Sequence, residues 1–247
     1  MTTQGARSSI LRPIPFHYCA GCSHSVLHRL LAEVIEELDL HRRAVGVCGV
    51  GCSFLMYDFL DLDFVSSSPG RAPSVAAGLK RAVPDAAVFT YQGETDALSA
   101  GLTDLVHAVS RNEKITMLVV NNCATGLSGG QLSPTVLAGQ KTRTTPAGRD
   151  PQQHGHPIRL SEMLAGMDLP ARIERVALNS PENVERARLA LRAAFRFPLE
   201  GRGTALVEVL GSCTTYWGLS PTDAETHVAQ TMVPAFPLGR FGRNEEG

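Results

Sequence analysis

Short apolar runs that are typical of buried strands alternate along this chain with longer segments whose apolar residues recur at helical spacing. Strands are expected at residues 44–49, 87–92, 115–120, 171–178 and 203–210, and helices at 23–38, 72–83, 98–109 and 181–195, the first capped by Ser23. Strands separated by helices favour a parallel sheet covered on both faces. The sequence therefore predicts an α/β fold with a doubly wound, mostly parallel sheet, in a single domain over residues 1–247.

Two stretches fall outside this alternation. Residues 134–159 are rich in Pro, Gly, Gln, Thr and Arg, and a loop of that length inside a compact domain is usually functional or lies at an interface. Residues 232–247 carry proline and phenylalanine without periodicity, so we expect an arm that packs on something rather than a core element. We expect both stretches to offer docking surface to partner chains.

Charge and hydropathy exclude several classes of partner. The chain carries 23 Lys and Arg against 24 Asp and Glu, a formal net charge of −1, so no bulk attraction to nucleic acid or anionic lipid is expected. Residues 1–9 are polar and lack the apolar core of a signal peptide. The uncharged stretch 44–57 is interrupted by glycine and is too short to span a bilayer. We therefore expect a cytoplasmic protein with reduced thiols and no membrane or nucleic-acid partner.

Four of the six cysteines stand where a sheet could bring them together. Cys19 and Cys22 share one tight loop, at about residues 16–24, and Cys52 and Cys213 each follow a strand-like run. Four thiolates can hold a [4Fe–4S] cluster because soft iron prefers soft sulfur, but zinc, a redox pair and incidental cysteines remain alternatives from spacing alone. The other two cysteines lie in or next to apolar strand-like segments and are expected to be buried and structural: Cys48 and Cys123.

A second group of polar residues follows two of the predicted strands. Gly93-Glu94-Thr95-Asp96 comes after one strand and Asn121-Asn122 after the next, and both loops should end at the carboxyl edge of the sheet. Glu94 and Asn122 can therefore converge on one hard cation such as Mg²⁺, which could hold a diphosphate. The alternative is that Glu94 merely begins a helix favourably and the asparagines make a turn.

A glycine-rich loop, Gly126-Leu127-Ser128-Gly129-Gly130-Gln131, directly follows the asparagines, and its backbone could approach a ligand closely. Residues 93–131 resemble the thiamine diphosphate fingerprint, Gly-Asp-Gly followed by Asn-Asn. The surrounding motifs resemble the β subunit of 2-oxoacid:ferredoxin oxidoreductases, in which Cys-Pro-Gly-Cys-Gly-His and Gly-Ile-Gly-Cys-Ser correspond to residues 19–24 and 49–53. Further counterparts lie at 70–73, 139–142, 148–150, 213–218, 232–234 and 237–239.

The resemblance covers residues 16–241 and is closest to the multi-subunit type that oxidises 2-oxoglutarate or branched-chain 2-oxoacids. It implies a thiamine diphosphate-binding fold and oxidative decarboxylation of a 2-oxoacid to an acyl-CoA, with electrons passed through a [4Fe–4S] cluster to ferredoxin. The implied partners are α and further γ or δ subunits, ferredoxin, the 2-oxoacid and coenzyme A. The acid that activates the cofactor is expected on a partner subunit.

The resemblance also assigns site residues. It implies [4Fe–4S] ligation by Cys19, Cys22, Cys52 and Cys213. It implies Mg²⁺ ligation by Glu94, Asn122 and the backbone carbonyl of Ala124. The implied contacts to thiamine diphosphate are Val50, Gly51, Cys52, Ser53, Gly93, Thr95, Asp96, Gly126 and Leu127.

Four departures from the family pattern fall in this region. Glu94 replaces Asp and extends the carboxylate by one methylene, Thr95 replaces Gly where a β-branched residue tolerates positive φ poorly, Pro69 replaces His, and Thr125 replaces Tyr. They motivate an alternative in which the chain is an electron-relay or scaffold subunit that keeps the iron–sulfur cluster but has lost thiamine chemistry. A thiamine-dependent non-oxidative decarboxylase is a third reading, although it would have no use for the cluster. The apolar stretch 54–56 favours a substrate with a bulky or apolar side chain.

Overall fold

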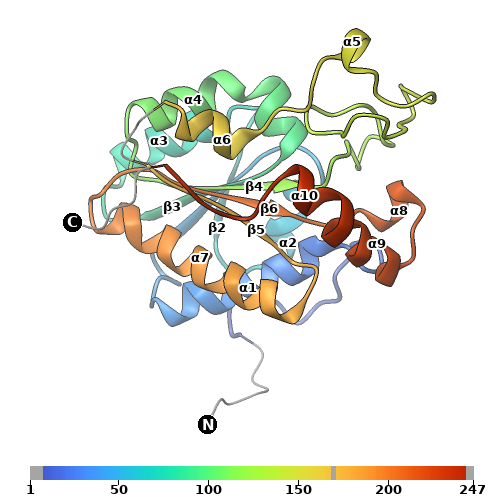
Figure 1. Ribbon diagram of the computed structural model, residues 1–247. Helices are drawn as coiled ribbons and strands as arrows, with labels where there is room; N and C mark the ends of the chain where they lie inside the picture. The colour runs from blue at the N-terminus through green and yellow to red at the C-terminus, as the bar shows by residue number, and fades with distance from the viewer. Residues whose placement is uncertain (1–7, 168–170, 243–247) are drawn as a thin grey trace.

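The computed structural model describes residues 8–167 and 171–242, and within them seven strands form one sheet in the order β2-β1-β3-β4-β6-β5-β7. The strands are β1 (Ala44–Cys48), β2 (Asp63–Ser66), β3 (Ala87–Gly93), β4 (Thr116–Asn121), β5 (Arg172–Ala177), β6 (Ala205–Leu210) and β7 (Gly239–Phe241). All described neighbours pair in parallel except β7, which runs antiparallel to β5. The predicted mostly parallel α/β sheet is confirmed (Figure 1).

Helices cover both faces of the sheet. The helices α1 (Ser23–Glu37) and α7 (Pro181–Leu199) lie on one face, and α3 (Ala72–Ala82), α4 (Leu102–Ser110) and α6 (Leu160–Ala165) on the other (Figure 1). The shorter elements are η1 (Cys52–Leu55), α2 (Met56–Phe59), η2 (Asp96–Ala100), α5 (Pro151–His154), α8 (Thr214–Trp217), α9 (Pro221–His227), η3 (Val228–Met232) and α10 (Val233–Ala235). None of the described helices is both long and apolar enough to cross a membrane.

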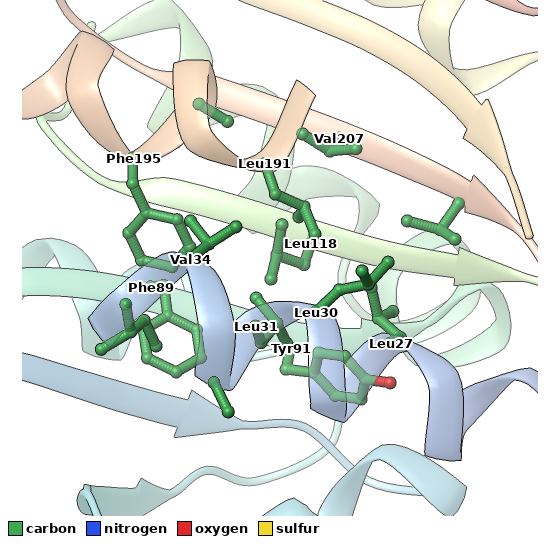
Figure 2. Close-up of a cluster of buried hydrophobic side chains, with 14 of the residues drawn as sticks. Leu27, Leu30, Leu31, Val34, Phe89, Tyr91, Leu118, Leu191, Phe195 and Val207 are labelled. Carbon is green, nitrogen blue, oxygen red and sulfur yellow. The ribbon is translucent and has the colours of Figure 1, made fainter. Parts of the chain in front are cut away.

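The larger core lies between the sheet and the pair α1 and α7. Leu27, Leu31 and Val34 recur on one side of α1 and belong to one buried cluster with Phe89 of β3 and Phe195 of α7. Figure 2 shows Val34 beside the two phenylalanine rings. Burying each such side chain contributes roughly 1.5–3 kcal/mol, so this face is a main source of stability. A substitution such as Leu31→Ala should cost about 2–5 kcal/mol because it leaves a cavity.

The expected elements are present, with three corrections. Ser23 is not the cap of α1, because the helix begins at that residue and its hydroxyl lies 2.9 Å from Ser212 Oγ. The helix expected over 98–109 begins instead with the π-helical turn η2, followed by α4. The edge strands β2 and β7 were not expected, since neither shows the apolar alternation of a half-buried strand.

The long segment between β4 and α6 is ordered around one buried arginine. It extends away from the sheet and carries only the short helix α5 (Figure 1). Arg149 is 6% exposed and donates hydrogen bonds to six backbone carbonyls, those of Ser133, Pro134, Val136, His154, Gly155 and His156. The long loop predicted at 134–159 is therefore present. Its backbone is held in place by Arg149, a residue of the loop itself.

The C-terminal arm belongs to this domain. Met232 and Phe236 are buried against Cys123, Ala177 and Leu210, and β7 adds a strand to the sheet beside β5. The arm expected to pack on something therefore packs on its own domain over residues 232–242, and the docking surface expected there stays a prediction. Residues 243–247 lie outside the described part of the chain.

Candidate functional site

A cavity of about 260 Å³ opens at the carboxyl ends of β1, β3 and β4. All nine residues predicted to contact the cofactor line it: Val50, Gly51, Cys52, Ser53, Gly93, Thr95, Asp96, Gly126 and Leu127. The three predicted magnesium residues also line it: Glu94, Asn122 and Ala124. The parallel sheet thus brings together side chains from loops far apart in the sequence, at the edge where such sheets commonly bind ligands.

Glu94 is a buried carboxylate without a cationic partner among the described residues. Its side chain is 2% exposed, and Oε1 accepts the backbone N–H of Ala124 at 3.0 Å. Burial raises the pKa of Glu94 to about 7, although hydrogen bonds from Ser133 and Ala124 oppose the shift. A nearby cation would reverse this shift, so the local chemistry fits a metal ion.

Asn122 presents an unused acceptor at the same place. Its Oδ1 is buried and has no hydrogen-bond partner within the described residues, although the side chain lines the cavity. Ser53, another residue that lines the cavity, also has a buried Oγ without a described partner. Buried polar atoms are almost always satisfied in native proteins, so two such atoms facing one cavity indicate a ligand that carries polar groups.

Asp96 has a structural role that the sequence did not reveal. Its Oδ1 accepts the Gly70 N–H at 2.8 Å and its Oδ2 accepts Gln92 Nε2 at 2.6 Å, so the carboxylate joins three segments around the cavity. The side chain lines the cavity, as predicted for a cofactor-contacting residue. The predicted contact to the cofactor stays a prediction.

The strain expected at Thr95 is absent. Its φ of −67° is ordinary helical backbone, so the β-branched side chain causes no conflict there. Thr95 Oγ1 lies 2.9 Å from Thr125 Oγ1, so two of the departures from the family pattern form a hydrogen bond with each other. Pro69, a third departure, lines the cavity and offers no donor.

The glycine-rich loop needs its glycines for close packing. Gly130 has a φ of 84°, and a Cβ there would overlap the ring of Tyr216, which donates to the Gly130 carbonyl. A Cβ at Gly126 would lie 3.3 Å from the sulfur of Cys213. The loop therefore lies between the cavity and the region of the fourth predicted cluster ligand.

The four predicted cluster cysteines lie in one neighbourhood. Burial raises the pKa of Cys22 to about 12 and that of Cys213 to about 11, and in both cases the charges of Cys19 and Cys52 raise it further. All six cysteines are free, and no group of three His, Cys, Asp or Glu side chains in the described ranges is closed tightly enough to hold a metal ion. Thiols whose ionisation is costly in a protein without a metal would become good ligands beside iron, so the donor set fits a cluster although the cage is not closed. Cys48 and Cys123 are buried, as expected.

A largely buried network of aromatic and histidine side chains next to Cys52 was missed. Tyr18 donates to the Cys52 carbonyl at 3.0 Å and lies 2.8 Å from His28 Nε2, while His24 Nδ1 lies 2.6 Å from Tyr91 Oη. Burial lowers the pKa of His24 to about 4, so its ring is neutral at pH 7. Two histidines four residues apart on the apolar face of a helix were the available signal.

Comparison with known proteins identifies the class. Residues 49–209 match the family described as thiamine pyrophosphate enzyme, C-terminal TPP binding domain. The match begins directly after β1, ends within β6 and so contains the loops that form most of the cavity. The chain therefore contains a thiamine diphosphate-binding domain, and this domain contributes most of the cavity lining.

Two relatives identify the family more closely. The chain is 41% identical over 229 residues to the ketoisovalerate oxidoreductase subunit VorA of Methanothermobacter thermautotrophicus, covering 93% of this chain and 48% of that protein. It is 30% identical over 219 residues to the 2-oxoglutarate synthase subunit KorB of Archaeoglobus fulgidus, covering 89% of this chain and 78% of that one. The chain belongs to the family of thiamine diphosphate-binding β subunits of 2-oxoacid:ferredoxin oxidoreductases.

A solved structure agrees with the fold. The 2-oxoglutarate:ferredoxin oxidoreductase from Magnetococcus marinus, with 2-oxoglutarate, coenzyme A and succinyl-CoA bound, superposes with a TM-score of 0.74 at 24% identity. The alignment covers 87% of this chain and 70% of that chain. This chain spans about half the length of the VorA relative it matches.

Proposed function

We propose that this chain is a catalytic β subunit that serves the oxidative decarboxylation of a 2-oxoacid to an acyl-CoA, with electrons passed through a [4Fe–4S] cluster to ferredoxin. One observation carries the proposal. Cys52 lines the cavity proposed to hold the cofactor, and its thiol is also close enough to Cys19, Cys22 and Cys213 for their charges to interact. A single residue thus joins the place of decarboxylation to the place where electrons would leave.

The cavity residues would hold the cofactor through its polar end. Asn122 Oδ1, the Glu94 carboxylate and the Ala124 carbonyl would hold Mg²⁺, and the loops at 50–53 and 126–127 would contact the diphosphate and the ring. When bound, thiamine diphosphate supplies the electron sink on which decarboxylation of a 2-oxoacid depends. Cys19, Cys22, Cys52 and Cys213 would hold the cluster.

The rim of the cavity supports an assembled complex. Val50 and Leu127 both line the cavity, and they are 44% and 63% exposed. Large apolar side chains exposed at the mouth of a site mark a surface that another molecule covers. We assign this cover to the α subunit, with further γ or δ subunits, ferredoxin and coenzyme A as the remaining partners. The free cysteines fit a cytoplasmic location, which we also propose.

The proposed substrate preference rests on the stretch that follows Cys52, although residues 54–56 do not themselves line the cavity. Phe54 and Leu55 of η1 are apolar and half-buried, and Met56 is buried, so they offer no charge to a second carboxylate. We therefore expect a 2-oxoacid with an apolar side chain to be preferred over 2-oxoglutarate, with its carboxylate held by backbone or by the partner subunit.

Anaerobic purification with the partner subunits tests the proposal. The complex should be brown, and it should reduce a viologen dye only when a 2-oxoacid and coenzyme A are both present. A panel of 2-oxoisovalerate, 2-oxoglutarate and pyruvate then ranks the substrates. A correctly assembled complex that oxidises no 2-oxoacid would refute the proposed activity.

One observation favours the relay alternative. The Glu94 carboxylate, which would bind Mg²⁺, already accepts the N–H of Ala124. If that bond keeps the carboxylate away from the metal, the chain carries electrons without binding thiamine diphosphate. Calorimetric titration of the complex with thiamine diphosphate in excess Mg²⁺ separates the two functions, since clear binding rejects the relay.

A further inference from the structure

A buried network of charged and polar side chains lies next to the Asn121–Ala124 turn. Glu208 of β6 is 1% exposed, and its carboxylate accepts hydrogen bonds from Asn121 Nδ2 at 2.8 Å, Ser161 Oγ at 2.7 Å and Arg175 Nε at 2.9 Å. Asn121 and Arg175 belong to β4 and β5, which flank β6, and the sheet register places Arg175 directly opposite Glu208. Glu208 does not line the cavity.

The charge of Glu208 decides which way the Asn121 amide points. An ionised carboxylate only accepts hydrogen bonds, so Asn121 must present its NH₂ group to it and its Oδ1 to the other side. A neutral amide at position 208 would also carry a donor. One of the three groups that now donate to Glu208 would then meet a second donor, and Asn121 could turn over.

The oxygen end of Asn121 holds the turn that follows. Asn121 Oδ1 accepts the N–H of Cys123 at 3.2 Å, and Cys123 has a left-handed φ of 49°. A residue other than glycine persists in this conformation only when its surroundings hold it there. Asn122 and Ala124, on either side of Cys123, line the cavity.

Arg175 holds the Glu208 carboxylate in place through their ion pair. Arg175 is fully buried, makes a second ion pair with Glu162, and lies over the rings of Phe236 and Phe241 with its guanidinium carbon 5.4 and 4.9 Å from their centroids. Burial alone would lower the pKa of Arg175, but the hydrogen bonds and charges of Glu162 and Glu208 raise it. The C-terminal arm therefore closes the network on its outer side.

We propose that Glu208 is a positioning residue that sets the Asn121–Ala124 turn through the Asn121 amide, without contacting the ligand. The inference rests on the proposed function only for the identity of the ligand at the turn, namely Mg²⁺ with thiamine diphosphate. The geometry of the turn itself is a property of the chain without cofactor, so it can be tested separately.

Hydrogen exchange of the cofactor-free chain in its assembled complex is the first test. Glu208→Gln should accelerate exchange at the Cys123 amide by about tenfold, because the bond to Asn121 Oδ1 is lost from part of the population. The matched control is Glu113→Gln, which neutralises a buried carboxylate with two arginine partners, Arg81 and Arg111, before β4. The control should leave the Cys123 amide within about twofold of the parent.

A second variant avoids an unpaired buried charge. Asn121→Ala keeps Ser161 and Arg175 on Glu208 and should give the same acceleration at Cys123. If Glu208 acts through Asn121, the double variant should be no worse than the worse single variant, whereas independent effects would multiply. Unchanged Cys123 exchange in Glu208→Gln, or multiplied effects in the double variant, would overturn the proposal.

Calorimetry gives the consequence for the ligand. Glu208→Gln should weaken thiamine diphosphate binding in excess Mg²⁺ by roughly 10–100-fold, as removal of a residue behind a metal site does, and Glu113→Gln should not. If the parent complex binds no thiamine diphosphate, the proposed function fails. The exchange data still decide whether Glu208 positions the turn.

Discussion

Two buried glutamates at opposite edges of the sheet differ in how they are neutralised. Glu113, at the amino edge before β4, is 7% exposed and forms ion pairs with Arg81 and Arg111 at 2.5 and 2.9 Å. Glu94, at the carboxyl edge after β3, has backbone and hydroxyl donors but no cation among the residues described. At the amino edge the chain's own arginines neutralise the buried carboxylate, whereas at the carboxyl edge none of the described residues neutralises Glu94.

Two residues other than glycine with left-handed backbone show the same difference between the two edges. Asn112 at the amino edge has a φ of 52°, suits that conformation intrinsically, and its Oδ1 accepts the N–H of Thr204. Cys123 at the carboxyl edge has a φ of 49° and depends on Asn121 for support. At the carboxyl edge the unfavourable backbone conformation of Cys123 thus depends on a neighbouring side chain. Conformational strain of this kind is typical of functional sites.

The largest expected effect distinguishes a cysteine at the carboxyl edge from one inside a strand. Cys213→Ser should remove most of the iron, since a hard hydroxyl is a poor ligand and a three-cysteine cluster tends to lose iron. Cys48→Ser, in buried β1, should keep the iron and lose only modest stability. Iron content and the low-temperature EPR signal of the reduced protein decide, and the opposite pattern would refute the ligand assignment.

The next effect compares two asparagines. Asn122→Ala should weaken thiamine diphosphate binding in Mg²⁺ by at least about 100-fold with little loss of stability, because its Oδ1 makes no described bond in the chain alone. Asn112→Ala should lower the free energy of unfolding by about 1–2 kcal/mol and leave binding unchanged, because it removes the bond to Thr204. Calorimetry and chemical denaturation measure the pair. Equal effects on binding would break the comparison of the two edges.

Replacing Glu94 and Glu113 by glutamine should change the free energy of unfolding in opposite directions. Because the pKa of Glu94 rises from 4.5 to about 7 on folding, its contribution to stability is present below pH 4.5 and is lost as pH rises through 7. Glu94→Gln should therefore raise the free energy of unfolding of chelator-treated protein at pH 8 by roughly 1–3 kcal/mol. Glu113→Gln should lower it by about 1 kcal/mol, a modest loss because the two arginines are largely exposed.

Denaturation curves at pH 5 and pH 8 check both signs. The gain in Glu94→Gln should be confined to the higher pH, since a protonated Glu94 is already neutral. A loss of stability in Glu94→Gln at pH 8 would mean that the carboxylate is satisfied without a metal.

The smallest effect compares two threonines. Thr125→Val removes the bond to Thr95 beside the open cavity and should cost about 0.5 kcal/mol, since water can replace the partner. Thr204→Val removes a buried bond to the Glu113 carbonyl at 2.6 Å and should cost about 1–2 kcal/mol. Denaturation at one pH measures both, and the reverse order would contradict the assignment of the cavity as solvent-accessible.

Local sequence patterns predicted the central parallel strands but not the edge strands or the C-terminal arm. The buried strands β1, β3, β4 and β6 are continuous apolar runs, which is why their positions could be read directly. The edge strand β2 is mostly exposed, so burial imposes no pattern on it. The arm at 232–242 carries apolar residues whose partners lie on β5, on β6 and in the turn after β4, and no local period records such contacts.

The site also has parts that the sequence predicted and parts that it did not. Glu94 and Asn122 could be placed together because strand ends in a parallel sheet share an edge. The pairing of Arg175 with Glu208 could not be predicted, because it depends on the register between β5 and β6. Charged residues in a strand-like run read as exposed, yet both of these side chains are buried.

The two outermost strands are the shortest in the described sheet, with four residues in β2 and three in β7. A second chain that extended the sheet from either side would find only a few backbone groups to bond. Short edge strands of this kind discourage lateral growth of the sheet by strand pairing between chains. A partner chain would therefore have to dock on loops and helices rather than extend the sheet.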